Sequence, residues 1–248
     1  MDIIFWFSGT GNSLYAAKRL SERLGNFELF RITEQAPSGV VGGGGSKVGF
    51  VFPSYFGNLP RAVRAFVEKL EFNPDTYIFT VVTMGMFGQG SVGALNKALK
   101  SKGSSLNYGA SVRMPANYVV NYNPADPAKS AKSLAQADER LEKTAAEISS
   151  GALLVKTVPF TANNLYRNIE KLDAGFTVSD ACTVCNLCEE ICPVANVRMK
   201  DGKPTWQHRC EHCMACISLC PAKAIDYKQR TQTRRRYINP YIKAEDFK

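Results

Sequence analysis

The sequence predicts an α/β fold in which a doubly wound parallel sheet is followed by a small α+β domain. Over the first half of the chain, short apolar runs alternate with segments of helical period. This alternation indicates a parallel sheet with helices on both faces. All eight cysteines lie in two short runs near the C-terminus, and 248 residues are enough for both domains.

The first elements are an apolar strand at 2–7, a glycine-containing loop and an amphipathic helix. The apolar residues of that helix recur at helical spacing: Leu14, Ala17, Leu20 and Leu24. Further strands are expected at 47–53, 76–83 and 105–114. Further helices are expected after Pro60, after the loop at 84–93, from Pro127 to Gly151 and across 160–176.

Three polar, glycine-rich loops follow strand ends, at 8–13, 53–59 and 84–93. In a doubly wound sheet, ligands bind beyond the carboxyl ends of the strands, at the point where the strand order reverses. We therefore expect the three loops to converge on one site.

The loop SGTGNS at 8–13 is suited to an anion, because its backbone N–H groups and the following helix N-terminus can face one. Neutral side-chain donors add to it, but it has no Walker A lysine, and Leu14 stands where a Rossmann loop has its third glycine. This composition favours a monoester phosphate held by amides and hydroxyls.

Two other glycine-rich stretches are weaker candidates for a phosphate-binding loop. GQGSVG at 88–93 matches the dinucleotide motif, but the next strand end carries Arg113 where an acidic residue would be expected, so NAD(P) is the lesser alternative. Residues 34–46 precede a strand and are expected to form a surface loop.

The cysteine runs CTVCNLCEEICP (182–193) and CEHCMACISLCP (210–221) share one spacing and a terminal proline. A disulfide framework would distribute its thiols along the chain. Structural zinc, the remaining alternative, usually takes two well-separated ligand pairs. The spacing resembles that of bacterial two-cluster ferredoxins, in which the fourth cysteine of each run ligates the other cluster.

This resemblance implies two 4Fe-4S clusters with crossed ligands. The first would be held by Cys182, Cys185, Cys188 and Cys220, and the second by Cys210, Cys213, Cys216 and Cys192. Asp201 and Gly202 indicate a hairpin between the runs, and His208 and His212 are expected at the surface. An apolar shell around the sulfurs is expected from Ile191, Val194, Ile217, Leu219 and Ile225.

FSGTGNS, PSYFGN and TMGMFG, together with the cysteine runs, resemble the flavodoxin-fused two-cluster ferredoxin family over nearly the whole chain. The resemblance implies a flavodoxin-like, five-stranded doubly wound sheet and a bacterial-type dicluster ferredoxin domain. The implied organisation is an FMN-binding domain at 1–158, a connecting helix at 159–176, the ferredoxin domain at 177–228 and a basic tail at 229–248.

By the same resemblance, the first domain would bind FMN. Tyr55, Phe56 and Phe87 are the candidates to stack on its ring, or else they plug the end of the core. Tyr118 lies just past a strand end, near the site or simply in a turn. The implied FMN contacts are Ser8, Gly9, Thr10, Gly11, Asn12, Ser13, Pro53, Ser54, Tyr55, Phe56, Gly57, Asn58, Thr83, Met84, Gly85, Phe87 and Asn117.

The formal charge of +9 and the segment RTQTRRRY at 230–237 raise the question of nucleic acid. No nucleic-acid-binding motif is present, and bound clusters and flavin phosphate would lower the charge to about +3. We expect the basic tail to dock on the first domain or on an acidic redox partner. With no apolar run long enough to span a membrane and no secretory leader, a reducing cytoplasm is expected.

These features predict an electron carrier in which FMN exchanges electrons with two 4Fe-4S clusters, coupling one-electron and two-electron redox partner proteins. No acid–base or nucleophilic group stands out, so no catalytic residue is assigned. The alternative is an iron-sulfur flavoenzyme that reduces a small substrate at the flavin edge. Homodimer formation is left open.

Overall fold

The computed structural model describes residues 2–25, 27–33, 39–86, 88–157 and 164–247. Its main sheet has six strands in the order β2-β1-β4-β6-β7-β8, and every pair in it is parallel. The strands are β1 (Ile3–Trp6), β2 (Glu28–Arg31), β4 (Lys47–Pro53), β6 (Tyr77–Met84), β7 (Tyr108–Arg113) and β8 (Leu154–Val155).

The predicted doubly wound parallel sheet is confirmed, with six strands instead of five. The sixth is β8, a short return of the chain that pairs with β7 only at Tyr108 and Gly109. Within the sheet, the first five strands follow the flavodoxin-type order 2-1-3-4-5. The order reverses between β1 and β4, which places the topological switch point there.

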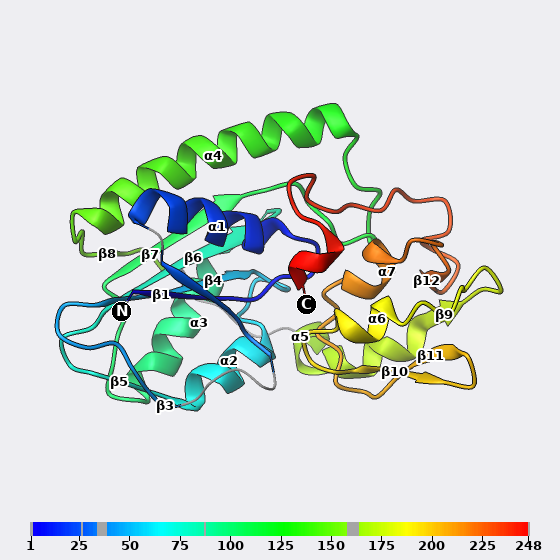
Figure 1. Cartoon of the computed structure of the whole chain (residues 1–248), viewed down its shortest axis with the longest axis horizontal. Coiled ribbons are helices and arrows are strands. Elements are labelled where there is room, and N and C mark those ends of the chain that lie inside the picture. The colour runs from blue at the N-terminus through cyan, green and yellow to red at the C-terminus, as the bar shows by residue number, and fades with distance from the viewer. Residues whose placement is uncertain (1, 26, 34–38, 87, 158–163, 248) are drawn as a thin grey trace.

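Helices cover both faces of the sheet (Figure 1). One face packs against α1 (Asn12–Leu24) and α4 (Pro127–Ser149), and the other against α2 (Arg61–Glu68) and α3 (Gln89–Lys100). The sequence of β1 is continuously apolar because both faces of the strand are buried. Ile4 and Trp6 enter one core cluster, and Ile3 and Phe5 enter the other. No described helix is both long and apolar enough to cross a membrane.

The predicted ends of α4 are confirmed. The Asp126 side chain accepts a hydrogen bond from the Lys129 N–H at 2.9 Å, Pro127 begins the helix, and Gly151 has a φ of +72° just after it. The expected surface loop at 34–46 is only partly right. Residues 34–38 lie outside the described residues, whereas β3 (Gly39–Val41) pairs with β5 (Leu70–Phe72) in a separate two-stranded sheet.

The C-terminal domain is small and built around the cysteine runs. Asp201 and Gly202, both with positive φ, form the predicted hairpin turn. The segment expected as one joining helix, 160–176, is divided into a short helix and a 3-10 turn, and its residues 160–163 lie outside the described residues. The elements are α5 (Asn164–Arg167), η1 (Ile169–Gly175), β9 (Phe176–Val178), α6 (Leu187–Glu190), β10 (Val197–Lys200), β11 (Lys203–Trp206), α7 (Ala215–Leu219), β12 (Ile225–Tyr227) and η2 (Ala244–Phe247).

The C-terminal tail packs on the N-terminal domain, the first of the two roles expected for it (Figure 1). Phe247 is fully buried in the core shared by α1 and α4, with its ring edge-on to Trp6 at 6.4 Å. Arg31 donates to the Phe247 carbonyl, and Lys18 pairs with Asp246. The tail therefore contributes to the fold of the first domain.

The basic run of the tail is used for internal contacts. Arg234 donates to the carbonyl of Val119 at 2.6 Å, and Arg235 donates to the carbonyl of Pro124 at 2.9 Å. The third arginine of the run, Arg236, is largely buried against the C-terminal domain. These guanidinium groups connect the two domains instead of forming a free basic patch.

Replacing the last core residue tests this role of the tail. We expect Phe247→Ala to lower the free energy of unfolding by about 3–5 kcal/mol, because it empties a fully buried aromatic site. Urea unfolding followed by tryptophan fluorescence measures the change. The control Leu153→Ala, at a side chain that is 78% exposed, is expected to change stability by about 0.5 kcal/mol or less. Equal stability of the two variants would show that the tail does not support the core.

Candidate functional site

A cavity of about 650 Å³ lies at the carboxyl ends of β1, β4 and β6, where the strand order reverses. We call it the switch-point cavity. The three predicted loops converge on it. All the residues expected to contact FMN line it except three: Gly11 and Asn58 lie outside the lining, and Phe87 lies outside the described residues.

The loop at 8–13 is buried and leads into α1. Its shape depends on Gly11, whose φ of +95° suits glycine and whose N–H donates to the Ser8 hydroxyl at 3.1 Å. No side chain caps α1, so the free N–H groups of its first turn are available to a ligand. The loop and the helix end together have the form of an anion site.

The two hydroxyls of this loop that flank Gly11 are held by neighbours. Thr10 accepts a hydrogen bond from the Asn117 amide, which leaves the threonine proton free to be donated elsewhere. Ser13 and Thr83 share a hydrogen bond of 2.7 Å, so one of their two protons is also available. Thr10 and the Ser13–Thr83 pair thus each keep one hydroxyl donor for an anion in the loop.

Asn12 differs from its expected role as a ligand donor. Its amide nitrogen donates to the Pro115 carbonyl at 2.9 Å, and its oxygen accepts from the Tyr237 hydroxyl at 2.7 Å. Asn239 of the tail donates from its backbone to the Thr10 carbonyl at 2.9 Å. The side chain of Asn12 therefore braces the loop against the tail.

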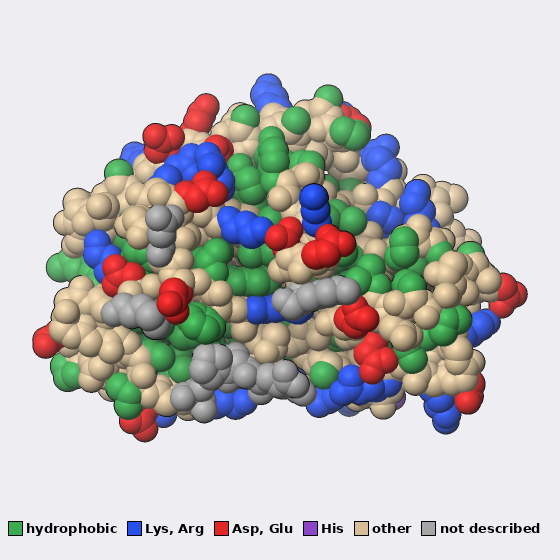
Figure 2. Space-filling view, in the orientation of Figure 1, with side chains coloured by type: hydrophobic (Ala, Val, Ile, Leu, Met, Phe, Trp, Pro, Cys, Tyr) green, Lys and Arg blue, Asp and Glu red, His purple; other side chains and the backbone are tan. Residues whose placement is uncertain are grey.

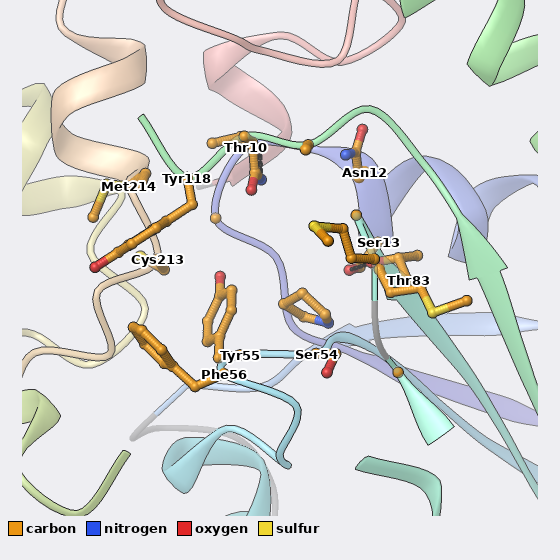
Figure 3. Close-up of a pocket in the computed structure, with 18 of the residues that line it drawn as sticks. Thr10, Asn12, Ser13, Ser54, Tyr55, Phe56, Thr83, Tyr118, Cys213 and Met214 are labelled. Atoms are coloured by element: carbon orange, nitrogen blue, oxygen red, sulfur yellow. Dashed lines mark hydrogen bonds between the residues drawn. The ribbon is translucent and has the colours of Figure 1, made fainter. Parts of the chain in front are cut away.

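Aromatic side chains form the wall opposite the loop. Figure 3 shows Tyr55, Phe56 and Tyr118 around one end of the cavity. Phe56 lies edge-on to Tyr118 at 5.5 Å. The Tyr55 hydroxyl is buried without a hydrogen-bond partner in the described part of the chain, and burial raises its pKa well above the usual value. A ligand acceptor in the cavity would satisfy this hydroxyl.

The second cysteine run closes the cavity from the other domain. Its residues His212, Cys213 and Met214 line the cavity. Gly9 touches the backbone of this run so closely that a Cβ at Gly9 would lie 2.0 Å from the Cys213 carbonyl oxygen. Any side chain at position 9 would separate the loop from the cysteine run.

His212 corrects the sequence-based expectation of a surface histidine. It is buried, and its Nδ1 lies 2.9 Å from the Tyr118 hydroxyl. Burial lowers its pKa to about 4, so the ring is neutral at neutral pH. It packs against Phe176 and Tyr227 because it points inward from a left-handed backbone position (φ 52°). His208 is exposed as expected, with Nδ1 2.8 Å from the buried Asp173.

The eight cysteines are grouped around two small enclosed spaces, each lined by thiols from both runs. Besides other residues, one is lined by Cys182, Cys185, Cys188 and Cys220. The other is lined by Cys192, Cys210, Cys213 and Cys216. Within the described residues, no three His, Cys, Asp or Glu side chains are arranged to hold a single metal ion. Cubane ligands are set further apart than those of one ion, because each thiolate binds a different iron.

The thiol electrostatics show the same two groups. Burial, followed by the neighbouring thiols of Cys185, Cys220 and Cys182, raises the pKa of Cys188 to about 11. Burial, followed by the neighbouring thiol of Cys192, raises the pKa of Cys213 to about 12. Deprotonation of these thiols therefore requires a compensating cation such as a bound metal.

The two runs also share one backbone conformation. Non-glycine residues with positive φ occupy equivalent positions, Val184 with His212 and Asn186 with Met214. Such conformations are unfavourable and cluster at functional sites. The local amides serve the sulfurs, because N–H groups point to the sulfurs of Cys192, Cys210 and Cys220 at 3.2, 3.2 and 3.3 Å. Hydrogen bonds of this kind tune metal-bound thiolates.

The expected apolar shell is divided between the domains. Ile217 and Ile225 pack in the same cluster as the cysteines. Ile191 and Leu219 instead enter the core formed with α1 and α4, and Val194 packs on the other core. These three side chains join the cysteine domain to the sheet domain.

Glu211 in the second run fixes the orientation of α2. Its buried carboxylate accepts the backbone N–H groups of Ala62 and Arg61, at 2.8 and 3.2 Å, at the start of that helix. Arg61 in turn donates to the Cys210 carbonyl at 2.8 Å. Burial raises the pKa of Glu211, while Arg61 and the two amides favour its charged form. Glu211, which lies between the candidate ligands Cys210 and Cys213, therefore caps the N-terminus of α2.

Several cavity residues had no clear signal in the sequence. Those from 212–214 become neighbours of the loop only through packing between domains. Gly88 and Gly90 belong to the stretch that was considered as a dinucleotide-binding loop. The stretch at 117–122 is rich in asparagine and tyrosine, which was another sequence feature that pointed to the cavity. The additional lining residues are Met86, Gly88, Gly90, Pro115, Ala116, Tyr118, Asn121, Tyr122, His212, Cys213 and Met214.

Comparison with known proteins identifies the cysteine-rich part of the chain. Residues 181–225 match the family model described as the 4Fe-4S dicluster domain. No match was found among curated proteins. A doubly wound sheet with flavodoxin-type strand order and a 4Fe-4S dicluster domain are thus joined in one chain, and the resemblance seen in the sequence is confirmed.

Solved structures similar to the chain cover its N-terminal part. A flavodoxin from Streptococcus pneumoniae TIGR4 is 17% identical, with coverage of 60% of this chain and 97% of that chain and a TM-score of 0.40. The Trp repressor binding protein from Bacillus subtilis is 12% identical, with coverage of 55% and 96% and a TM-score of 0.35.

Removing the Glu211 carboxylate tests the contact between the domains. We expect Glu211→Ala to lower the free energy of unfolding by about 2 kcal/mol, because two buried amides lose a charged acceptor. Hydrogen exchange at the Arg61 and Ala62 amides should become faster. Glu71→Ala, which removes an exposed carboxylate, is the control and should leave both quantities unchanged. Unchanged exchange at the start of α2 in Glu211→Ala would contradict the cap.

Proposed function

We propose that this chain is an electron-transfer protein that binds FMN in the switch-point cavity and two 4Fe-4S clusters in the C-terminal domain. One observation carries the proposal. Cys213 lines the switch-point cavity, and it also lines the enclosed space of Cys192, Cys210 and Cys216. A flavin and a cluster bound at these places would be separated only by Cys213 and Met214, the two residues that line both spaces.

The residues of the cavity fit FMN. The uncapped end of α1 and the hydroxyls of Thr10 and Ser13 suit a phosphate. The Tyr55 hydroxyl is buried at the cavity and has no hydrogen-bond partner in the described residues. Among the described residues, no Asp or Glu side chain lines the cavity, so no carboxylate there would repel a phosphate.

The two enclosed spaces fit the clusters and favour the crossed ligand set. Each space is lined by three thiols of one run and the fourth thiol of the other run. The amides directed at Cys192 and Cys220 belong to residues that follow the proline of each run, Asn196 and Ala224. The proline thus turns the chain so that the fourth thiol is held away from its own run.

When bound, a flavin takes up one or two electrons and each cluster takes up one, so the pair can join two-electron and one-electron redox partners. The chain itself orients the two sites and limits water between them. Gly9 lets the loop touch the Cys213 backbone, and buried His212 and Met214 fill the remaining space. Redox partner proteins are part of this proposal.

One feature favours the alternative of a flavoenzyme acting on a small substrate. Met86 is 67% exposed and Tyr122 is 37% exposed, although both line the cavity. The cavity is therefore open to solvent at these two residues. Turnover of a small acceptor at this opening, without any partner protein, would favour the enzyme.

The loop hydroxyls test the flavin site. We expect the double variant Thr10→Ala with Ser13→Ala to bind FMN about 10- to 100-fold more weakly, because it removes two donors to a charged phosphate. Fluorescence titration of flavin-free protein measures the affinity, and iron content should be unchanged. The control removes two hydroxyls away from the cavity, in Ser150→Ala with Thr205→Ala. Undiminished affinity in the first variant would place the phosphate elsewhere.

The fourth cysteines test the crossed ligand set. We expect Cys192→Ala to degrade the cluster held by Cys210, Cys213 and Cys216, and Cys220→Ala to degrade the cluster at the first run. Iron should fall toward half of the about eight atoms of two clusters in each variant. Anomalous scattering from iron in crystals of each variant identifies the surviving cluster. Loss of the cluster beside Cys182 in Cys192→Ala would overturn the crossed assignment.

A further inference from the structure

A second hollow, of about 500 Å³, lies between β7 and α4. Its cations come from two elements, Arg113 from the end of β7 and Lys129, Lys132 and Arg140 from α4. Met84, the last residue of β6, lines both this hollow and the switch-point cavity. The two sites are therefore neighbours at the carboxyl edge of the sheet. We call the second one the basic hollow.

The helix side of the basic hollow is a continuous stripe. Residues 129, 132, 136 and 140 are three or four positions apart and lie on one helix face. Three of these four positions carry a cation, and the fourth carries Gln136. The stripe thus directs four long polar side chains toward the strand that ends in Arg113.

The polar lining consists of hydrogen-bond donors without an acid. Besides the four cations, Ser111, Ser133 and Gln136 line the hollow, and no carboxylate in the described part of the chain does. Lys129 has an exposed ion pair with Asp126 at 3.6 Å, which is weak. Arg113, Lys132 and Arg140 form no ion pair with any described residue. The hollow therefore has an uncompensated positive charge.

Protection of a strand edge explains only part of this arrangement. Beyond Gly109, β7 has no strand partner on its outer side among the residues that the structure describes, and charged side chains discourage pairing at such an edge. Protection of the edge would require only Arg113. It does not explain the row of cations on the facing helix, whose like charges repel one another. Elsewhere, basic and acidic side chains are interspersed, as Figure 2 shows for one face. Arg19, for example, is paired with Glu22 and Asp138.

We propose that the basic hollow binds the oligophosphate group of a small molecule. Two arginines can each hold two phosphate oxygens, and two lysines add mobile point charges. Several convergent cations call for a multiply charged anion, and the volume lies in the range of small-molecule sites. The proposal is independent of the cofactors proposed above, since Met84 is the one residue that the two sites share. Free pyrophosphate and a nucleotide diphosphate present the same chemistry.

Calorimetric titration tests the basic hollow. The protein, saturated with FMN so that the loop at 8–13 is filled, is titrated with pyrophosphate and separately with ADP at low salt. We expect one molecule bound per chain, and about tenfold or greater loss of affinity in Lys132→Ala with Arg140→Ala. The control removes the same charge on the opposite face of the sheet, in Lys97→Ala with Lys100→Ala of α3. It should bind nearly as well as the unaltered chain.

The outcomes of the titration distinguish the two sources of phosphate, and two results would contradict the proposal. Equal affinity for pyrophosphate and ADP would assign recognition to the phosphates alone, whereas tighter ADP binding would assign it to a nucleotide. Failure of the unaltered chain to bind either probe would overturn the proposal. An equal loss in the α3 control would also overturn it, since net charge alone would then explain the binding. Thermal unfolding of each variant confirms that it is folded.

Discussion

The contact between Gly9 and the Cys213 backbone is the constraint on which the rest of the site depends. A Cβ at position 9 would lie 2.0 Å from the Cys213 carbonyl oxygen, so this approach is available to glycine alone. It places the loop after β1 directly against the second cysteine run. The switch-point cavity and the enclosed space around Cys213 are then adjacent by construction, and no linker movement is needed to bring them together.

Other contacts keep that approach in place from three sides. Glu211 and Arg61 connect the second cysteine run to the start of α2. Arg31 donates to the Ile191 carbonyl at the end of the first run. The tail holds the loop through Asn239 and anchors itself with Phe247. Because each of these connections joins segments far apart in the sequence, the two domains share a core instead of meeting at an exposed boundary.

The sequence could predict features that depend on local pattern. Alternating apolar runs predicted the sheet and its helices, and the Asp126–Pro127 pair and Gly151 predicted the ends of α4. The repeated cysteine spacing predicted a 4Fe-4S dicluster domain, which the family match supports. Most residues expected at the flavin site line one cavity, because loops at the carboxyl ends of neighbouring parallel strands must meet.

Features that depend on packing between distant segments could not be predicted from the sequence. Strand β2 is a half-buried edge strand without a long apolar run, and β8 has only two residues. His212 looks like a surface residue, but Phe176, Tyr227 and Tyr118 bury it. Asn12 looks like a ligand donor, but its amide nitrogen donates to the carbonyl of Pro115, 103 positions away. In each case the deciding partner comes from a segment that no local pattern identifies.

In the proposed function, one chain holds a flavin beside iron-sulfur clusters, with Cys213 lining both sites. Quantification of flavin, iron and acid-labile sulfide in protein purified without oxygen tests it most directly. We expect one FMN per chain together with about eight iron atoms and about eight sulfides. Zinc in place of iron, or full cluster content in a chain that cannot bind FMN, would contradict it.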